Sequence, residues 1–118
     1  MLFSKNHIWL KVEGDMAKIG VSDYAQEQLG GILFINLPEA GEQLEIGKRF
    51  GDIESIKTVS DLLSPIDGIV LRINVDLLDM PEAINLEPYE SWIIEARIEQ
   101  LSRELMDKEA YDKYRTAL

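Results

Sequence analysis

The 118-residue sequence predicts a mainly β protein, a sandwich of two sheets with short helices and a helix at the C-terminus. Three observations predict this fold class. Short runs rich in isoleucine, leucine and valine alternate with glycine-containing turns over the first two thirds of the chain, as antiparallel strands do. Residues at about 100–118 change to the wider apolar spacing of a helix. Short motifs recur in two halves of the chain, which indicates two related sheets.

The first elements follow from local signals. His7–Val12 and Met16–Val21 are expected to pair as a hairpin across a turn that contains Gly14. Ser22 or Asp23 can cap a short helix that ends at Gly30-Gly31. The remaining runs predict strands, with one helical turn at Asp76–Met80: Ile32–Leu37, Gln43–Ile46, Phe50–Ile56, Thr58–Leu63, Ile69–Val75 and Trp92–Ile98.

The tail at about 100–118 is expected to be helical. Leu101, Leu105, Met106 and Tyr111 form an apolar stripe, and Asp107 can cap the stretch that follows it. Such a helix would cover a sheet edge that is otherwise open to aggregation.

The internal repeat predicts how the strands are divided between the two sheets. Val21-Ser22-Asp23 recurs as Val59-Ser60-Asp61, and Gly31–Asn36 resembles Gly68–Asn74 with one residue inserted. Two halves of about four strands each would give two similar sheets that face one another.

Length and composition restrict the class of protein. A chain of 13.4 kDa can bury one core but not two, so one domain over residues 1–118 is expected. The absence of cysteine excludes disulfides, thiol nucleophiles and cysteine metal sites, and a single histidine excludes a histidine metal cluster. With 22 acidic against 12 basic residues, the surface repels nucleic acid and suits partners with basic surfaces. No signal peptide and no run of about 20 apolar residues is visible, so we expect a cytoplasmic protein of bacterial type or a mature organellar protein.

One lysine stands out between two extended runs. Lys57 would lie at or beside a hairpin tip, where the backbone is stiff and the side chain is exposed. Its β-branched neighbours Ile56 and Thr58 disfavour a type I′ turn and favour type I. A lysine amine forms a stable amide with a carboxylic acid, and its four methylenes give the attached group a long reach. These properties suit a tethered prosthetic group.

The segment Glu54-Ser55-Ile56-Lys57-Thr58-Val59-Ser60-Asp61 resembles the lipoylation site of the glycine cleavage system H-protein family. The resemblance extends over about His7 to Tyr111, and Ile56 and Thr58 replace the methionines that flank the lysine of biotinyl domains. Further matching segments are His7-x-Trp9, Ile19–Gly30, Leu37–Gly41, Ser64-Pro65-x-x-Gly68, Asn74, Pro81-Glu82-x-x-Asn85, Pro88-Tyr89 and Trp92.

The resemblance implies a fold and a role. The fold is a flattened β sandwich (barrel-sandwich hybrid) of the lipoyl/biotinyl type, here a single lipoyl-binding domain over residues 1–118. The role is that of a non-catalytic carrier in glycine catabolism with lipoate on Lys57, attached by a lipoate ligase or lipoyl transferase. The lipoyl-lysine takes an aminomethyl group from glycine decarboxylase, delivers it to aminomethyltransferase and is reoxidised by dihydrolipoamide dehydrogenase. Neither nucleic acid nor membrane is an expected partner.

The resemblance also implies a set of site residues. Glu54 and Asp61 flank the lysine and would help partners recognise the tip. In the family the loaded arm folds back into a cleft, which the resemblance places beside Asn6, His7, Ile8 and Asp61. The family usually has glutamate at the position of Ile8 and often serine at the position of Asn6. An aminomethyl ammonium beside Ile8 would lack a counter-charge there, at a cost of several kcal/mol in a site without water.

The departure at Ile8 leaves other roles open. H-like proteins also carry lipoate for heterodisulfide-reductase-like sulfur oxidation, where the cargo is a sulfur intermediate, or are linked to lipoate-dependent protein ADP-ribosylation. A third role is the relay of lipoate to other lipoyl domains. A further hypothesis comes from a different class of function: a binding domain that keeps the fold but carries no lipoate.

Overall fold

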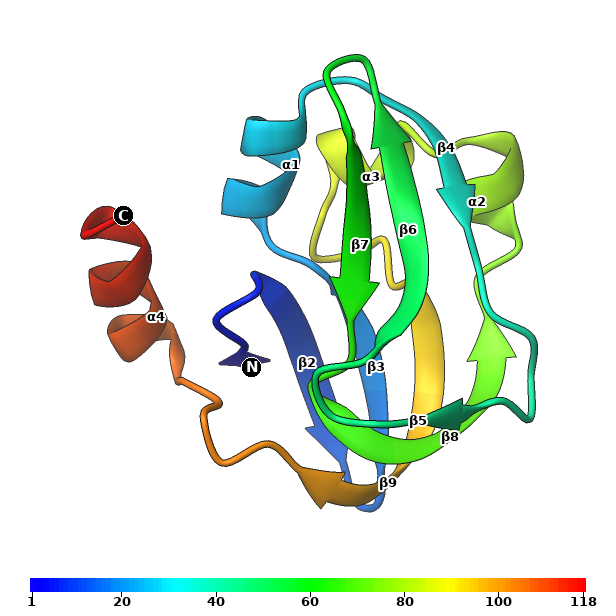
Figure 1. The fold of residues 1–118 in the computed structure, drawn as a ribbon, viewed down its shortest axis with the longest axis vertical. Coiled ribbons are helices and arrows are strands. Elements are labelled where there is room, and N and C mark those ends of the chain that lie inside the picture. Colours follow the sequence, from blue (N-terminus) through cyan, green and yellow to red (C-terminus); the bar gives the residue numbers. More distant parts are fainter.

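The computed structural model describes all residues from Met1 to Leu118, arranged in two antiparallel sheets packed face to face (Figure 1). The larger sheet has six strands in the order β1-β2-β3-β9-β8-β5, and the smaller has three in the order β4-β6-β7. The six strands are β1 (Leu2–Phe3), β2 (Ile8–Glu13), β3 (Met16–Val21), β9 (Ile94–Leu101), β8 (Ile66–Ile73) and β5 (Gln43–Leu44). The three strands are β4 (Ile32–Asn36), β6 (Arg49–Ser55) and β7 (Val59–Leu63). The expected mainly β sandwich is confirmed.

Four short helices complete the fold: α1 (Asp23–Leu29), α2 (Asp76–Asp79), α3 (Ala83–Leu86) and α4 (Lys108–Thr116). Helices α2 and α3 lie in the connection between β8 and β9, and α1 joins β3 to β4. No helix has the length and apolar character that a membrane crossing requires.

The core lies between the two sheets. Ile35, Ile53 and Leu62 point inward from the small sheet, because alternate residues of a strand face opposite sides. They belong to one cluster of 19 buried residues that includes Leu10 and Ile66 of the large sheet. Burial of such side chains stabilises the fold by about 1.5–3 kcal/mol each.

The first hairpin and helix form where the sequence predicts them. Strands β2 and β3 pair from Ile8 opposite Val21 to Glu13 opposite Met16. The Ser22 hydroxyl accepts a hydrogen bond from the Ala25 N–H (3.2 Å), which caps α1. Gly30 ends the helix with a φ of 74°, a conformation that glycine adopts without strain.

The prediction of two similar four-stranded sheets is wrong. The sheets have six and three strands instead of two similar sets. Val21-Ser22-Asp23 ends a strand and starts α1, whereas Val59-Ser60-Asp61 lies wholly within β7. The same three residues therefore serve two different local structures, because their neighbours decide between a helix cap and a strand.

The tail contains less helix than expected. Strand β9 continues to Leu101, and the helix begins only after Asp107, whose carboxylate accepts from the Ala110 N–H (2.8 Å). Phe3 and Met106 exchange two backbone hydrogen bonds of 2.8 Å beside the edge strand β1. The ring of Tyr111 stacks on Phe3 at 4.4 Å between centroids. Helix α4 thus lies against the edge of the large sheet, as the apolar stripe predicts.

Candidate functional site

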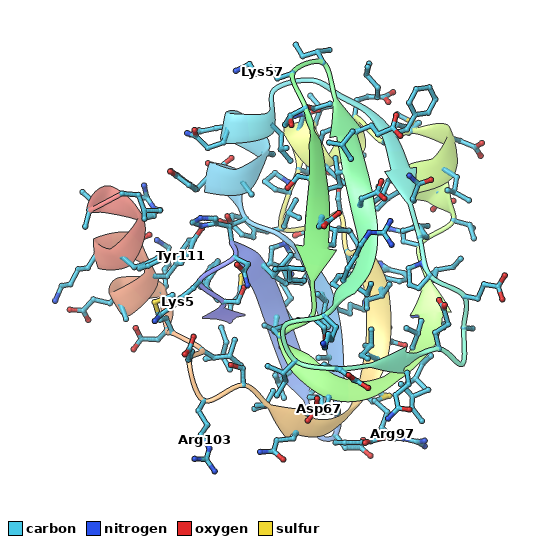
Figure 2. All side chains as sticks on the ribbon, viewed as in Figure 1. Lys5, Lys57, Asp67, Arg97, Arg103 and Tyr111 are labelled. Atoms are coloured by element: carbon cyan, nitrogen blue, oxygen red, sulfur yellow. The ribbon has the colours of Figure 1, made fainter.

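Lys57 lies at the tip of the β6–β7 hairpin, at one extreme of the molecule (Figure 2). The side chain is exposed and its Nζ forms neither an ion pair nor a hydrogen bond within the chain. The sequence-based placement of this lysine at a hairpin tip is confirmed. The amine is therefore free to react with an incoming group.

The tip is closed by a serine side chain. The hydroxyl of Ser55 accepts from the backbone N–H groups of Lys57 and Thr58 (3.2 Å each) and donates to the Thr58 carbonyl (3.1 Å). No residue of the tip has a positive φ, which excludes types I′, II and II′ and agrees with the expected type I turn. The backbone beneath Lys57 is therefore held by side-chain as well as main-chain hydrogen bonds.

The tip is also tied to distant segments. The Ile56 N–H donates to the Gly31 carbonyl (2.9 Å). The amide of Asn85, at α3, donates to the Gly30 carbonyl (2.8 Å) and accepts from the Ile32 N–H (2.9 Å). A Cβ placed on Gly30 would lie 3.4 Å from Cε of Lys57, so the aliphatic part of the lysine passes over this glycine. Three parts of the chain thus fix the base of the Lys57 side chain.

A cleft of about 270 Å³ lies between α1, the start of β2 and β7. It contains four of the six residues that the resemblance implies: Asn6, His7, Ile8 and Asp61. Leu29, the neighbour of Gly30, also lines the cleft, so the cleft opens next to the path of the Lys57 side chain. Its other lining residues are Val21, Tyr24, Ala25, Gln28, Ile53, Ser60 and Leu62.

His7 connects this cleft to the C-terminal helix. Its Nδ1 lies 2.8 Å from the Tyr111 hydroxyl, which in turn lies 2.7 Å from the Ser22 hydroxyl. Burial lowers the pKa of His7 below its ordinary value, and the neutral ring dominates near neutral pH. The φ of 65° at His7 is the only positive value at a non-glycine residue. His7 thus has a structural contact with Tyr111, which no local pattern in the sequence indicates.

Ile8 offers little surface to the cleft. Only 2% of the residue is exposed, and its side chain packs in the core cluster. Ile8 is therefore a core residue at the floor of the cleft, and it offers no counter-charge there.

Asp61 already has a cation beside it. It lies directly opposite Asp52 on β6, and two facing carboxylates repel one another. Arg49 bridges them: it contacts Asp52 and places its Nε 3.3 Å from Asp61. Hydrogen bonds from Asn36 and Arg49 hold the pKa of Asp52 below its usual range. A cationic cargo would share Asp61 with Arg49.

Glu54 lies elsewhere. It is paired with Phe34 on β4 and with Val59 on β7, in the row that faces away from the core. The structure thus separates Glu54 from the cleft and places it on the outer face of the small sheet.

Sequence reasoning missed Ser55, Asn85 and Tyr111 as supports of the site. A serine just before an exposed tip is a signal for side-chain closure of the turn, so Ser55 could have been found. Asn85 and Tyr111 contact residues 53 and 89 positions away, and no local pattern reports such contacts.

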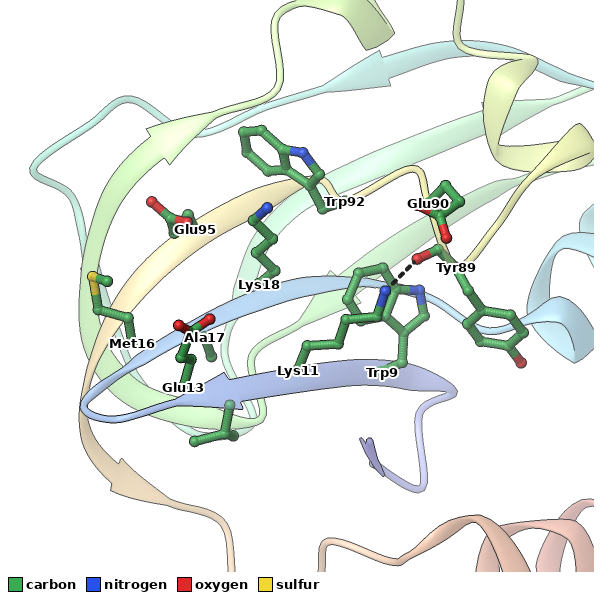
Figure 3. A pocket seen from close by; sticks show the side chains of 11 residues that line it. Trp9, Lys11, Glu13, Met16, Ala17, Lys18, Tyr89, Glu90, Trp92 and Glu95 are labelled. Carbon is green, nitrogen blue, oxygen red and sulfur yellow. Dashed lines mark hydrogen bonds between the residues drawn. The ribbon is translucent and has the colours of Figure 1, made fainter.

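A second cleft, of about 230 Å³, lies on the outer face of the large sheet (Figure 3). Trp9 forms one wall, but it is only 1% exposed and its Nε1 donates to the Pro88 carbonyl (3.0 Å). Lys11 and Lys18 lie over Trp9 and Trp92, at 5.3 and 5.6 Å from the ring centroids. These residues stabilise the sheet surface, as expected for tryptophans that belong to the packing.

A two-sheet sandwich that presents one lysine on a braced hairpin beside a cleft is the architecture of a carrier domain for a tethered group. The profile of the glycine cleavage H-protein family matches residues 1–117. The glycine cleavage system H protein of Oceanobacillus iheyensis is 45% identical over 117 residues, covering 97% of this chain and 93% of the relative. That of Bacteroides thetaiotaomicron is 46% identical over 112 residues, covering 92% and 89%.

The fold agrees with this relationship. The crystal structure of a glycine cleavage system H protein from Mycobacterium marinum superposes with a TM-score of 0.91 at 31% identity, covering 99% of this chain and 96% of the other. The chain belongs to the glycine cleavage H-protein family, whose members are lipoyl carriers without catalytic activity of their own.

Proposed function

We propose that Lys57 is the lipoate attachment site and that the chain carries an aminomethyl group from glycine decarboxylase to aminomethyltransferase. Dihydrolipoamide dehydrogenase then reoxidises the carrier, and a lipoate ligase or lipoyl transferase loads it. The observation that supports this most is the unpartnered Lys57 amine on a tip braced by Ser55, in a chain of this family.

The residues around Lys57 suit an amide-linked arm. Amide formation joins Nζ to the activated carboxyl carbon of lipoate, releases the activating group and removes two protons from the ammonium. Because Nζ has no partner in the chain, no ion pair has to break first. When bound, lipoate supplies a disulfide that opens to accept the cargo.

The cleft beside α1 suits the free end of such an arm. Leu29 and Val21 offer buried apolar side chains, while Asn6, Gln28 and Ser60 offer polar groups. This mixture could shelter an apolar arm and hydrogen-bond a small polar cargo at its end. Attachment to Lys57 keeps the cargo at a high local concentration near each partner.

The intact mass of the protein tests whether lipoate is attached to Lys57. The purified chain, incubated with lipoate, ATP and a lipoate–protein ligase, should gain one lipoyl group, and Lys57→Arg should abolish the gain. Lys48→Arg, at another exposed lysine, is the matched control and should leave the gain unchanged. An unmodified wild-type chain beside a lipoylated reference domain would remove the proposal.

A second candidate function rests on the cleft. Ile8 gives it an apolar floor, and its one acidic residue, Asp61, already contacts Arg49, so an ammonium would compete with Arg49 for it. A cargo without positive charge, such as the sulfur intermediate of a heterodisulfide-reductase-like complex, or a relay of lipoate itself, would avoid this problem.

One assay separates the two candidates. The fully lipoylated chain should support glycine–bicarbonate exchange by glycine decarboxylase if it carries aminomethyl groups. Exchange that matches a reference H-protein supports the first function, and no exchange at full lipoylation supports the second. Asp61→Asn should reduce exchange if the Asp61 carboxylate receives the cargo's ammonium.

A further inference from the structure

The outer face of the small sheet carries a group of exposed apolar side chains next to Lys57. The group, here called the tip face, consists of Leu33, Phe34, Ile56 and Val59, which are 49%, 62%, 66% and 60% exposed. Phe34 and Val59 stand in one cross-strand row with Glu54 between them. Ile56 is the immediate neighbour of Lys57 and packs over Gly30 and Gly31.

A β-bulge creates part of this surface. The pairing of β4 with β6 shifts between Ile32 and Phe34, so Leu33 is an extra residue. Without the shift, Leu33 and Phe34 would point to opposite sides of the sheet. With it, both are exposed while Ile32 and Ile35 remain buried. The fold thus turns two consecutive large apolar residues toward solvent beside the lysine.

The charges around the tip face are mainly acidic. Glu54 lies within it and the exposed Asp61 follows along the outer surface of β7, whereas Asp52 is buried and paired with Arg49. Arg49 pairs with Asp52 and Asp61, and acylation would remove the charge of Lys57. Apolar centres with a charged rim are typical of protein docking sites.

The geometry points to the tip face as the docking surface for enzymes that act on Lys57. Such an enzyme would present an apolar pocket for Phe34 and Val59 and a lysine- or arginine-rich rim opposite Glu54 and Asp61. The inference rests on the proposed function, because an enzyme that takes the lysine into its active site must cover the surface next to it. Charge complementarity favours this occupant over a second copy of an acidic chain, which would repel.

The rate of lipoate attachment to Lys57 reports how well a ligase docks on the tip face. Phe34→Ser and Val59→Ser change exposed side chains and should leave the unfolding midpoint in urea close to wild type. We expect the double variant to lose about tenfold or more in kcat/KM for attachment by a lipoate–protein ligase. Val12→Ser is the matched control: it is the same change at a valine 43% exposed on the large sheet, and kcat/KM should stay within about twofold.

The outcomes are distinct. If the wild-type chain is lipoylated and the double variant reacts as fast as Val12→Ser, the docking inference is overturned while Lys57 attachment stands. If the wild-type chain is not lipoylated, the proposed function itself fails. A fall in kcat/KM with rising salt supports the basic rim, and no salt dependence overturns that part. A wild-type dimer in light scattering that Phe34→Ser dissociates would assign the tip face to a second copy instead.

Discussion

The imidazole Nδ1 of His7 lies 2.8 Å from the hydroxyl of Tyr111, a residue 104 positions later in the chain. This contact joins the cleft beside α1 to the C-terminal helix. The same hydroxyl meets Ser22, which caps α1, so one phenol connects three segments. The cap, the cleft and the last helix are therefore parts of one hydrogen-bonded unit.

Tyr111→Phe tests this unit. The change removes one buried hydroxyl and leaves His7 and Ser22 with fewer partners, which should cost about 1–3 kcal/mol in the free energy of unfolding. Urea denaturation measures it. Tyr114→Phe is the control, because the Tyr114 hydroxyl makes an exposed bond to the Lys5 carbonyl and should cost less than about 1 kcal/mol. Equal losses in the two variants would contradict a special role for Tyr111.

The pH dependence of stability should report His7. Its pKa is lower in the folded protein, because burial disfavours the charged ring, so the unfolded chain binds more protons in this range. The free energy of unfolding should fall as the pH drops below about 6.5 and stop falling below the folded pKa. His7→Asn should remove this slope while tolerating the positive φ. A wild-type slope that survives in His7→Asn would assign it to other groups.

Ile8→Glu is expected to be destabilising, even though glutamate is usual at this position in the family that the chain resembles. Ile8 is almost fully buried, so an ionised carboxylate there should cost at least about 3 kcal/mol. Burial would raise the pKa of the new acid, so the loss should be larger at pH 8 than at pH 5. Comparing urea midpoints at both pH values against Ile8→Val checks this expectation. A stable, pH-independent Ile8→Glu would mean that the side chain turns into the cleft and meets a partner there.

Ser55→Ala should loosen the lysine tip without unfolding the sheet. The variant loses the hydroxyl that receives the Lys57 and Thr58 N–H groups, a local change worth about 1 kcal/mol. Amide hydrogen exchange at these two positions should speed up several-fold. Ser102→Ala, which removes a similar bond to the exposed Glu104 N–H, should leave the tip unchanged. Unaltered exchange at the tip would show that the main-chain bonds alone hold it.

Local signals predicted the elements whose contacts are local. The β2–β3 hairpin, the Ser22 and Asp107 caps and the exposed tip at Lys57 all depend on residues within a few positions of one another. The four-residue helix α3 was missed, because Ala83–Leu86 is too short for an apolar period to show. The division into six and three strands was also missed, since strand order depends on contacts distant in sequence.

The site shows the same limit. The resemblance brought Asn6, His7, Ile8 and Asp61 to one cleft, and the structure places them there. It gave no sign that Arg49 would reach Asp61, because that contact crosses from β6 to β7.

The bonds from Ile56 to Gly31 and from Asn85 to Gly30 and Ile32 tie the base of the hairpin to two other segments and so restrict its bending. The movement of a group on Lys57 would then come mainly from rotation about the single bonds of the side chain itself. The rest of the protein would move as a rigid body. For each transfer of the attached group, one enzyme would have to release the whole molecule before the next could bind it. Turnover in such a relay would be governed by residence times at the enzymes, not by any rearrangement of the sandwich.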